Sequence, residues 1–343
     1  MEISLRTLGD RLCRMVQDVF ESLRKAQSTQ PSRVQHLFPP DKILALQTPR
    51  ELIMYRLRLF AARLFGSLMV FASLVLSMPA SAQTETLYFA PLPMEQPEEV
   101  VKQFKPLLNH LERQFNLQIV IRYSTSYDEI LERFRTGQID LAYLGPLPYV
   151  TLRNNFPHAE PVVHFLESNG QATYTCALIS AGAGMPPAGT KKTFALTQPL
   201  STCGYLTTDS LLQQQRSSLN KHAFRYLQKH DEVAQAVARG DYDYGGLNAS
   251  IARNYRHLGV RILAESPPLP SFALIANTQR LSPERIAQLR QHLSALAPKG
   301  KDLALMKDWG KQLRHGAIPA ADGDYLTVRK MLQNTPIPTK DNF

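Results

Sequence analysis

Apolar runs alternate with helically spaced apolar residues along most of the chain. Between 98 and 115 the apolar side chains recur every three or four positions, which predicts a helix, and β-rich runs at 86–93 and 117–123 predict a strand on either side. Ser126 with Glu129 forms a capping box, which opens the next helix. Strand, helix, strand, helix and strand in this order predict an α/β lobe built on a mostly parallel sheet.

Part of this pattern occurs twice. Residues 126–140 align with residues 229–243 without a gap, at an offset of 103 residues. In both copies an Asp-Glu pair complements the positive end of a helix, a glycine ends the helix, and an aspartate precedes the next strand. Two similar lobes are the simplest interpretation, and chance similarity within a common pattern is the alternative. In the first copy, a short buried strand of aromatic and aliphatic residues follows Gly137 and runs into the turn Gly145-Pro146, at the sheet edge where α/β proteins present ligands.

The second half of the chain continues the α/β pattern. We expect strands at 172–179, 192–196, 242–247, 260–264 and 272–276, and amphipathic helices at 282–296, 302–313 and 325–332. The three closing helices are expected to return to the first lobe and wrap it.

Hydroxyl residues and a glycine gather before one of the helices. Ser201, Thr202 and Gly204 lie where free backbone N–H groups and the helix dipole converge, which suits an oxyanion. An ordinary N-cap role for Ser201 or Thr202 is the alternative. Tyr174, the one aromatic residue of its strand, is either a packing residue or a ligand contact.

Residues 54–82 have the three parts of a secretory signal peptide. A short basic head precedes an uncharged apolar run at 64–78, and small residues at 80–82 form a cleavage site before Gln83. The apolar run is shorter than the ~20 residues that a membrane-spanning helix needs, so a retained anchor is the weaker interpretation. We therefore expect a periplasmic protein.

A signal peptide at 54–82 bears on two other features: the residues before it and the cysteines of the exported part. Residues 1–53 precede the basic head, so we interpret them as an extension upstream of a true start at Met54; a cytoplasmic tail is the alternative. In an oxidising compartment Cys176 and Cys203 can form a disulfide. A pair of free thiols is the alternative, because spacing alone does not decide between them.

Composition excludes two classes of protein. With 343 residues, 44% of them apolar and 20% charged, the chain is long enough for two globular domains and is not a disordered segment. The net charge of +10 divides into 11 basic against 6 acidic residues up to residue 82 and 28 against 23 beyond it. The chain has no basic run or basic-aromatic ladder, so nucleic acid is not expected as a partner.

The ordered set of these motifs resembles the periplasmic phosphonate-binding proteins of ABC transporters, over nearly all of residues 84–315. The motifs that carry the resemblance are the helix at Tyr127, Gly137-x-x-Asp140 followed by Tyr143-Leu144-Gly145-Pro146, Tyr174 in its strand, Ser201-Thr202-Cys203-Gly204-Tyr205, and His230 before Gly240-x-x-Asp243. The resemblance implies a two-lobed type II periplasmic binding protein fold with the ligand in the cleft between the lobes. Residues 83–172 and 266–343 would form the first lobe and residues 173–265 the second.

The resemblance also implies roles for single residues. Ser201 and Thr202 would hold the oxygens of a small phosphorus oxyanion, and Tyr127, Tyr174 and His230 would donate hydrogen bonds from around it. Further candidates are Gly145, Cys203, Gly204 and Ser250.

The chain departs from the family pattern in two ways. Family members selective for aminoalkyl phosphonates carry acidic residues at places that correspond here to Ser250 and to Ser271-Phe272. Since a buried ammonium without a carboxylate partner is costly, an aminoalkyl ligand is disfavoured. Cys203 is unusual as well, and a free thiol there would suit arsenite.

These observations leave three functional hypotheses. The first is a solute-binding protein that delivers a phosphonate, phosphite or phosphate-like anion to an ABC transporter permease, acting as a monomer without a cofactor or metal. The second keeps the same site but passes a signal to a membrane sensor. The third is an enzyme that uses Ser201 or Cys203 with His230 as base; the chain lacks a Gly-x-Ser-x-Gly elbow, so we expect no enzyme.

Overall fold

The computed structural model describes residues 84–343 except 95, 183 and 334, so the predicted signal peptide and the extension before it lie outside the described residues. The first lobe contains a six-stranded sheet in the order β13-β4-β12-β3-β1-β2. Strands β2, β1 and β3 are parallel, whereas β12 runs antiparallel to both of its neighbours. The strands are β1 (Glu85–Pro91), β2 (Leu117–Ile121), β3 (Leu141–Leu144), β4 (Ala159–Phe165), β12 (Ala273–Asn277) and β13 (Ala317–Pro319).

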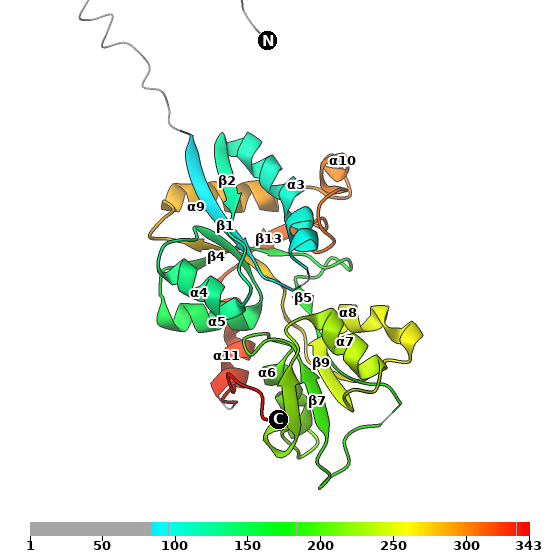
Figure 1. Cartoon of the computed structure of the whole chain (residues 1–343). Coiled ribbons are helices and arrows are strands. Elements are labelled where there is room, and N and C mark those ends of the chain that lie inside the picture. Colours follow the sequence, from blue (N-terminus) through cyan, green and yellow to red (C-terminus); the bar gives the residue numbers. More distant parts are fainter. Residues whose placement is uncertain (1–83, 95, 183, 334) are drawn as a thin grey trace, which may run out of the picture. The chain divides into compact units, whose positions relative to one another are not determined.

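Helices pack against this sheet, and Figure 1 shows them around it. They are α3 (Pro97–Phe115), α4 (Tyr127–Arg135), α5 (Pro146–Asn155), α9 (Pro283–Ser294) and the short α10 (Leu303–Met306). The core beneath them contains stacked and tilted aromatic pairs, among them Phe89 with Phe104 and Tyr143 with Phe272.

The second lobe contains a five-stranded sheet in the order β10-β6-β9-β7-β8. Its strands are β6 (Cys176–Ser180), β7 (Thr193–Leu196), β8 (Ala223–Tyr226), β9 (Tyr244–Asn248) and β10 (Arg261–Glu265). Its helices are α6 (Tyr205–Gln213), α7 (His230–Ala238) and α8 (Ala249–Asn254), with 3-10 turns η2 (Leu219–Lys221) and η3 (Arg256–Leu258). Because side chains alternate along a strand, Leu178 and Ile179 belong to separate apolar clusters on the two faces of this sheet.

Two crossing segments join the lobes. Strands β5 (Thr173–Tyr174) and β11 (Leu269–Pro270) lie on these segments and pair antiparallel with each other. The strand expected over 172–179 is therefore two short strands, β5 and β6. The fold is thus an α/β arrangement of two mixed sheets connected by a paired hinge.

The repeat is confirmed by matching geometry in the two lobes. Helices α4 and α7 begin at Tyr127 and His230, which are 103 residues apart. The glycines that follow, Gly137 and Gly240, have φ of 73° and 81°, a left-handed conformation that favours glycine. The two aspartates also make equivalent hydrogen bonds, since Asp140 accepts from the backbone N–H of Tyr88 at 2.7 Å and Asp243 from that of Thr193 at 2.9 Å.

The C-terminal part of the chain differs from expectation. The helix predicted over 302–313 is wrong beyond α10, because the chain turns at Gly310, whose N–H bonds the carbonyl of Gln103. A Cβ at Gly310 would lie 2.8 Å from the Cβ of Gln103, so only glycine allows this approach. After η4 (Asp322–Tyr325), helix α11 (Leu326–Gln333) contacts α5 of the first lobe and α6 of the second.

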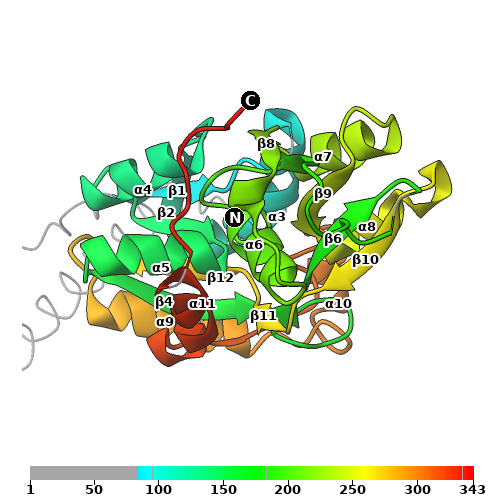
Figure 2. The same ribbon diagram turned by 90° about the horizontal axis from the view of Figure 1, so that it is seen from below.

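The last residues continue to the second lobe. The backbone N–H of Asn342 donates to the carbonyl of Phe224 at 3.2 Å, and the Asn342 side chain accepts from the Phe224 N–H at 2.7 Å. Figure 2 shows this tail leaving α11 and ending beside β8. These last residues were expected to belong to the first lobe, as part of 266–343, and they pair with the second lobe instead. No helix among the described residues is long and apolar enough to cross a membrane.

Candidate functional site

A small cavity lies where strands β1, β3 and β9 end. Its volume is about 10 Å³, which is room for about one water molecule. Residues from both lobes line it: Leu92, Tyr127, Gly145, Pro148, Tyr174, Ser201, Thr202, Cys203, His230, Asn248 and Phe272. The structure thus brings together seven of the nine candidates, and Gly204 directly follows the lining residue Cys203.

Five helices begin at this cavity. Tyr127 and His230 are the first residues of α4 and α7, Gly145 and Asn248 are the N-caps of α5 and α8, and Cys203 precedes the start of α6. The N-terminus of a helix carries a partial positive charge and unpaired N–H groups. The N–H groups of Tyr127, Leu147 and Ser250 already have side-chain partners. It is therefore mainly the partial positive charge of these five helix starts that favours an anion.

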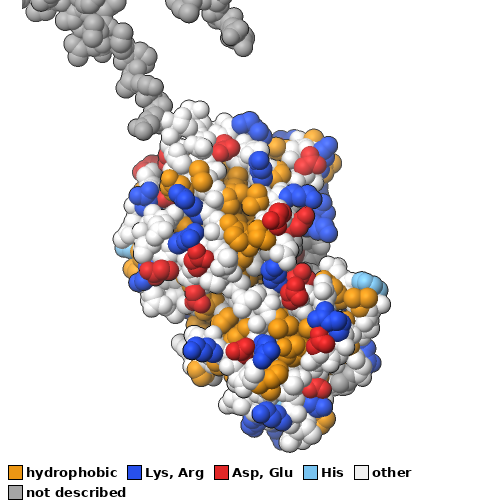
Figure 3. Space-filling view, viewed as in Figure 1, with side chains coloured by type: hydrophobic (Ala, Val, Ile, Leu, Met, Phe, Trp, Pro, Cys, Tyr) orange, Lys and Arg blue, Asp and Glu red, His pale blue; other side chains and the backbone are white. Residues whose placement is uncertain are grey.

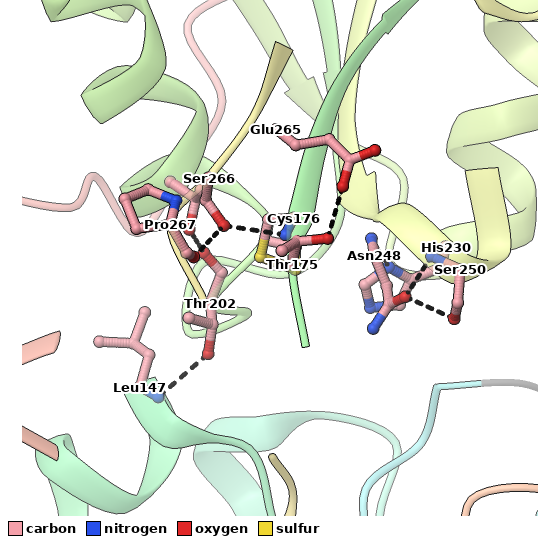
Figure 4. The surroundings of a disulfide bond; sticks show 12 residues. Leu147, Thr175, Cys176, Thr202, His230, Asn248, Ser250, Glu265, Ser266 and Pro267 are labelled. Atoms are coloured by element: carbon pink, nitrogen blue, oxygen red, sulfur yellow. Dashed lines mark hydrogen bonds between the residues drawn. A yellow bond between two sulfur atoms is a disulfide. The ribbon is translucent and has the colours of Figure 1, made fainter. Parts of the chain in front are cut away.

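Hydrogen bonds link the lobes across the cavity. The Thr202 hydroxyl accepts from the backbone N–H of Leu147 at 3.0 Å, and the Gln198 side chain accepts from the backbone N–H of Tyr127 at 2.9 Å. Figure 4 shows the first of these contacts at the start of α5. Ser201 of the second lobe also acts on the phenol of Tyr127, and Thr202 on that of Tyr174: each hydroxyl lowers the pKa of its phenol, against the larger effect of burial. The lobes are therefore closed on each other at the site.

His230 is held as a neutral donor. Its Nδ1 accepts a hydrogen bond from the backbone N–H of Asn248 at 3.1 Å. Burial lowers the pKa of His230 to about 4, so the ring is neutral near pH 7. Since Nδ1 is the acceptor, the remaining proton is on Nε2, which can donate to a ligand.

Asn248 is a cavity residue that the sequence reasoning missed. Its Oδ1 accepts from the backbone N–H and the hydroxyl of Ser250, at 2.8 and 2.7 Å. The amide NH₂ is then the group left to donate into the cavity. The repeat could have located this residue, because Asn248 lies 103 positions after the candidate Gly145.

The cavity lining carries no charged side chain. Among the described residues, those that form the lining include no Asp, Glu, Lys or Arg. Burial raises the pKa values of Tyr127 and Tyr174, so both phenols keep their protons. The polar lining thus consists of neutral groups with protons to donate, next to an apolar wall of Leu92, Pro148 and Phe272.

The cysteine alternative is resolved in favour of a disulfide. Cys176 and Cys203 are bonded through their sulfurs, with their Cα atoms 5.0 Å apart. Cys203 therefore offers no free thiol, and the reason for considering arsenite is removed.

Two further candidates take positions that differ from the expected ones. Ser250 is exposed on α8 and lies outside the cavity lining, so it is not a ligand contact in this arrangement. Gly204 is the N-cap of α6, and a Cβ there would meet Oγ1 of Thr197 at 2.9 Å and the carbonyl of Gln198 at 3.0 Å. The glycine therefore keeps the helix start close to the preceding turn.

A second, more open cavity lies within the first lobe. It is lined by Glu167, Lys299, Lys307, Arg314 and His315 among others. It contains none of the candidate site residues, so it is separate from the candidate site.

Comparison with known proteins identifies the family. Residues 89–325 match the phosphonate-binding family, described as ABC transporter, phosphonate, periplasmic substrate-binding protein. The chain belongs to this family. Members are substrate-binding components of transporters, and the resemblance drawn from the motifs is confirmed.

Individual relatives support this assignment. The phosphate-import protein PhnD of Mycolicibacterium smegmatis is 26% identical over 182 residues, which are 49% of this chain and 57% of that protein. The chain thus matches little more than half the length of this relative.

Two solved structures show the fold. PhnD1 of Prochlorococcus marinus in complex with methylphosphonate aligns with a TM-score of 0.63 at 16% identity, over 73% of this chain and 97% of the other. A binding protein component of an ABC phosphonate transporter from Pseudomonas aeruginosa aligns with a TM-score of 0.62 at 18% identity, over 73% and 86%. The two-lobed type II periplasmic binding protein fold is confirmed.

Proposed function

We propose that the protein captures a small phosphorus oxyanion in the periplasm and delivers it to the permease of an ABC transporter. The observation that carries this proposal is a closed cavity with neutral donors only, at the starts of five helices. Neutral donors and helix dipoles compensate a bound anion without a counter-ion. Family membership favours delivery to a transporter over delivery to a sensor.

The donors of the lining match phosphonate, phosphite or a phosphate-like anion, and the lobes would have to part to admit it. Oxygens would accept from Tyr127, Ser201, Thr202 and the Nε2–H of His230, and a small apolar substituent would face the wall that contains Phe272. A ligand amine would meet no carboxylate there, which disfavours aminoalkyl phosphonates.

A binding role agrees better with the site chemistry than an enzymatic one. A general base for Ser201 would need an unprotonated nitrogen facing it, but His230 uses Nδ1 as an acceptor for the Asn248 N–H. Cys203 is held in a disulfide. The protein therefore binds its ligand without covalent chemistry.

Partners other than the ligand and the permease are not part of the proposal. Figure 3 shows basic and acidic side chains interspersed over the face in view, which does not favour a nucleic acid. The protein acts as a monomer without a cofactor and is exported by the signal peptide at 54–82. Its lobes hinge at the paired crossing segments: residues 83–172 and 266–336 form the first lobe, and residues 173–265 form the second, which the tail at 337–343 contacts.

A ligand panel tests the proposal. Purified protein is titrated by calorimetry with methylphosphonate, phosphite, phosphate, aminoethylphosphonate and sulfate, and its melting temperature is recorded with each. A ligand that binds only the folded state raises the melting temperature. We expect at least one of the first three anions to bind more tightly than sulfate and aminoethylphosphonate. Binding of none of the phosphorus anions would contradict the proposal.

A further inference from the structure

The disulfide joins the two segments that carry the site hydroxyls. Cys176 follows Tyr174 by two residues at the start of β6, and Cys203 directly follows Ser201 and Thr202. Both cysteines are buried, at 1% and 2% exposure, so the bridge lies inside the molecule beside the cavity.

Cys176 is also hydrogen bonded to the crossing segment that leads back to the first lobe. Its N–H donates to the hydroxyl of Ser266 at 3.0 Å, and the N–H of Ser266 donates to the carbonyl of Cys176 at 2.9 Å. Figure 4 shows Ser266, Cys176 and Thr202 close together, with the Thr202 hydroxyl directed at Leu147. A continuous path therefore runs from the hinge through the disulfide to the contact between the lobes.

Apart from the disulfide, residues 201–204 make only local backbone hydrogen bonds. In the described part of the chain, the backbone bonds of residues 201–204 run to partners within residues 198–208. They fix the shape of the turn and run to no residue of β6. Packing of the following helix α6 on β6 and β9 and the covalent link through Cys203 hold the turn next to β6 and Tyr174.

We propose that the Cys176–Cys203 disulfide positions the anion site, so that ligand affinity depends on the oxidation state of this cysteine pair. The proposal rests on the proposed function of the cavity. A dithiol such as dithiothreitol converts the bridge into two cysteine thiols and is itself oxidised to its cyclic disulfide, with two electrons and two protons transferred. In the dithiol form the segment with Ser201 and Thr202 is released from β6, and the hydroxyls no longer converge on one anion.

The first test compares affinities for methylphosphonate by calorimetry. We expect the Cys176→Ala/Cys203→Ala variant to bind at least about 10-fold more weakly than the parent, the equivalent of one lost hydrogen bond to a charged group. Leu289→Ala is the control, because it removes buried apolar atoms from α9, which packs on β4 and β13 of the first lobe, away from both cysteine segments. If the paired variant folds poorly by circular dichroism, reduction of the parent by dithiothreitol and its reoxidation replace it, with affinity expected to fall and then recover.

The second test needs no ligand. Amide hydrogen exchange should increase at least about 10-fold at residues 145–150 and 201–208 in the dithiol form or the paired variant, while α9 stays as protected as in the parent. If the parent binds no methylphosphonate, the proposed function is in doubt and the exchange result decides this inference. The inference is overturned if the parent binds and loss of the disulfide changes affinity less than twofold, or if the parent does not bind and exchange at both segments is unchanged.

Discussion

Burial and hydrogen bonding keep single residues of the cavity neutral and protonated, so that they can donate hydrogen bonds. His230 is neutral because it is buried, and the Asn248 N–H fixes which nitrogen keeps the proton. Tyr127 and Tyr174 remain protonated for the same reason, since burial disfavours a phenolate. If an anion binds here as proposed, its charge is met by the orientation of neutral dipoles, and each donor can be tested separately.

Removal of one phenol oxygen should weaken the complex strongly. Tyr127→Phe keeps the ring and its packing but loses a hydrogen bond to a charged ligand, which contributes ~1.5–3 kcal/mol. We expect methylphosphonate to bind roughly 10- to 150-fold more weakly by calorimetry. Tyr149→Phe is the matched control, because its hydroxyl donates to Asp322, a residue outside the cavity lining. Equal losses in the two variants would show that the effect is not local to the site.

His230 should make the protein sensitive to acid. Its folded pKa is depressed from 6.5 to about 4, so the unfolded chain binds the proton more readily between these values. The neutral ring contributes its full share to the free energy of unfolding above pH 6.5. Roughly 3 kcal/mol of this free energy is lost as the pH falls from 6.5 towards 4. Urea unfolding at pH 7 and 4.5 should show a smaller loss for His230→Asn than for the parent. His257→Asn, at an exposed site, should behave like the parent.

At the scale of elements, periodicity located the strands and helices that have one buried face. Helix α3 shows this pattern and was predicted to within one residue. Helix α5 was missed because Leu147, Tyr149 and Val150 are buried on successive positions, which leaves no alternation to detect. The helix expected over 302–313 was wrong because packing of Gly310 against α3 ends it, and such a contact has no local signal.

The site was predicted from the order of motifs and from the repeat rather than from any single residue. Tyr127 and His230 were identified together because they occupy equivalent helix starts. Ser250 was chosen by correspondence with acidic positions in relatives, yet the inward residue of that helix start is its N-cap, Asn248. The disulfide could not be derived, because a separation of 27 residues says nothing about where two turns meet.

The N-cap of α8 provides a test of charge at the element scale. Asn248→Asp keeps a capping oxygen for the Ser250 N–H but adds a carboxylate to the cavity. We expect the affinity for methylphosphonate to fall at least about 100-fold, because the new carboxylate repels the anion at short range. The affinity for aminoethylphosphonate should fall less, because its ammonium pairs with the carboxylate. Asn254→Asp makes the same change at an exposed position of α8 outside the lining and serves as the control. Similar losses in both variants would indicate a general charge effect rather than a local one.

At the scale of the whole described region, two sets of contacts hold the lobes together in addition to the crossing segments. One is the pair of hydrogen bonds at the cavity, from the backbone of Tyr127 and of Leu147. The other is the C-terminal segment, in which Ile337 packs against the core clusters of both lobes and the Tyr226 hydroxyl donates to the carbonyl of Pro338 at 2.7 Å. The tail therefore makes contacts that an opening hinge would have to break.

Deletion of residues 337–343 should shift the ligand-free protein towards an open form. The contacts of Ile337 and Asn342 favour the closed arrangement. Without them a smaller fraction of the protein is closed, and the apparent affinity falls in proportion to that fraction, by about threefold or more. Small-angle scattering should give a larger radius of gyration for the truncated chain than for the parent without ligand. With saturating methylphosphonate the two radii should agree, which shows that the truncated chain still folds and closes. Identical ligand-free profiles together with unchanged affinity would mean that the tail plays no part in closure and that the cavity hydrogen bonds alone hold the lobes.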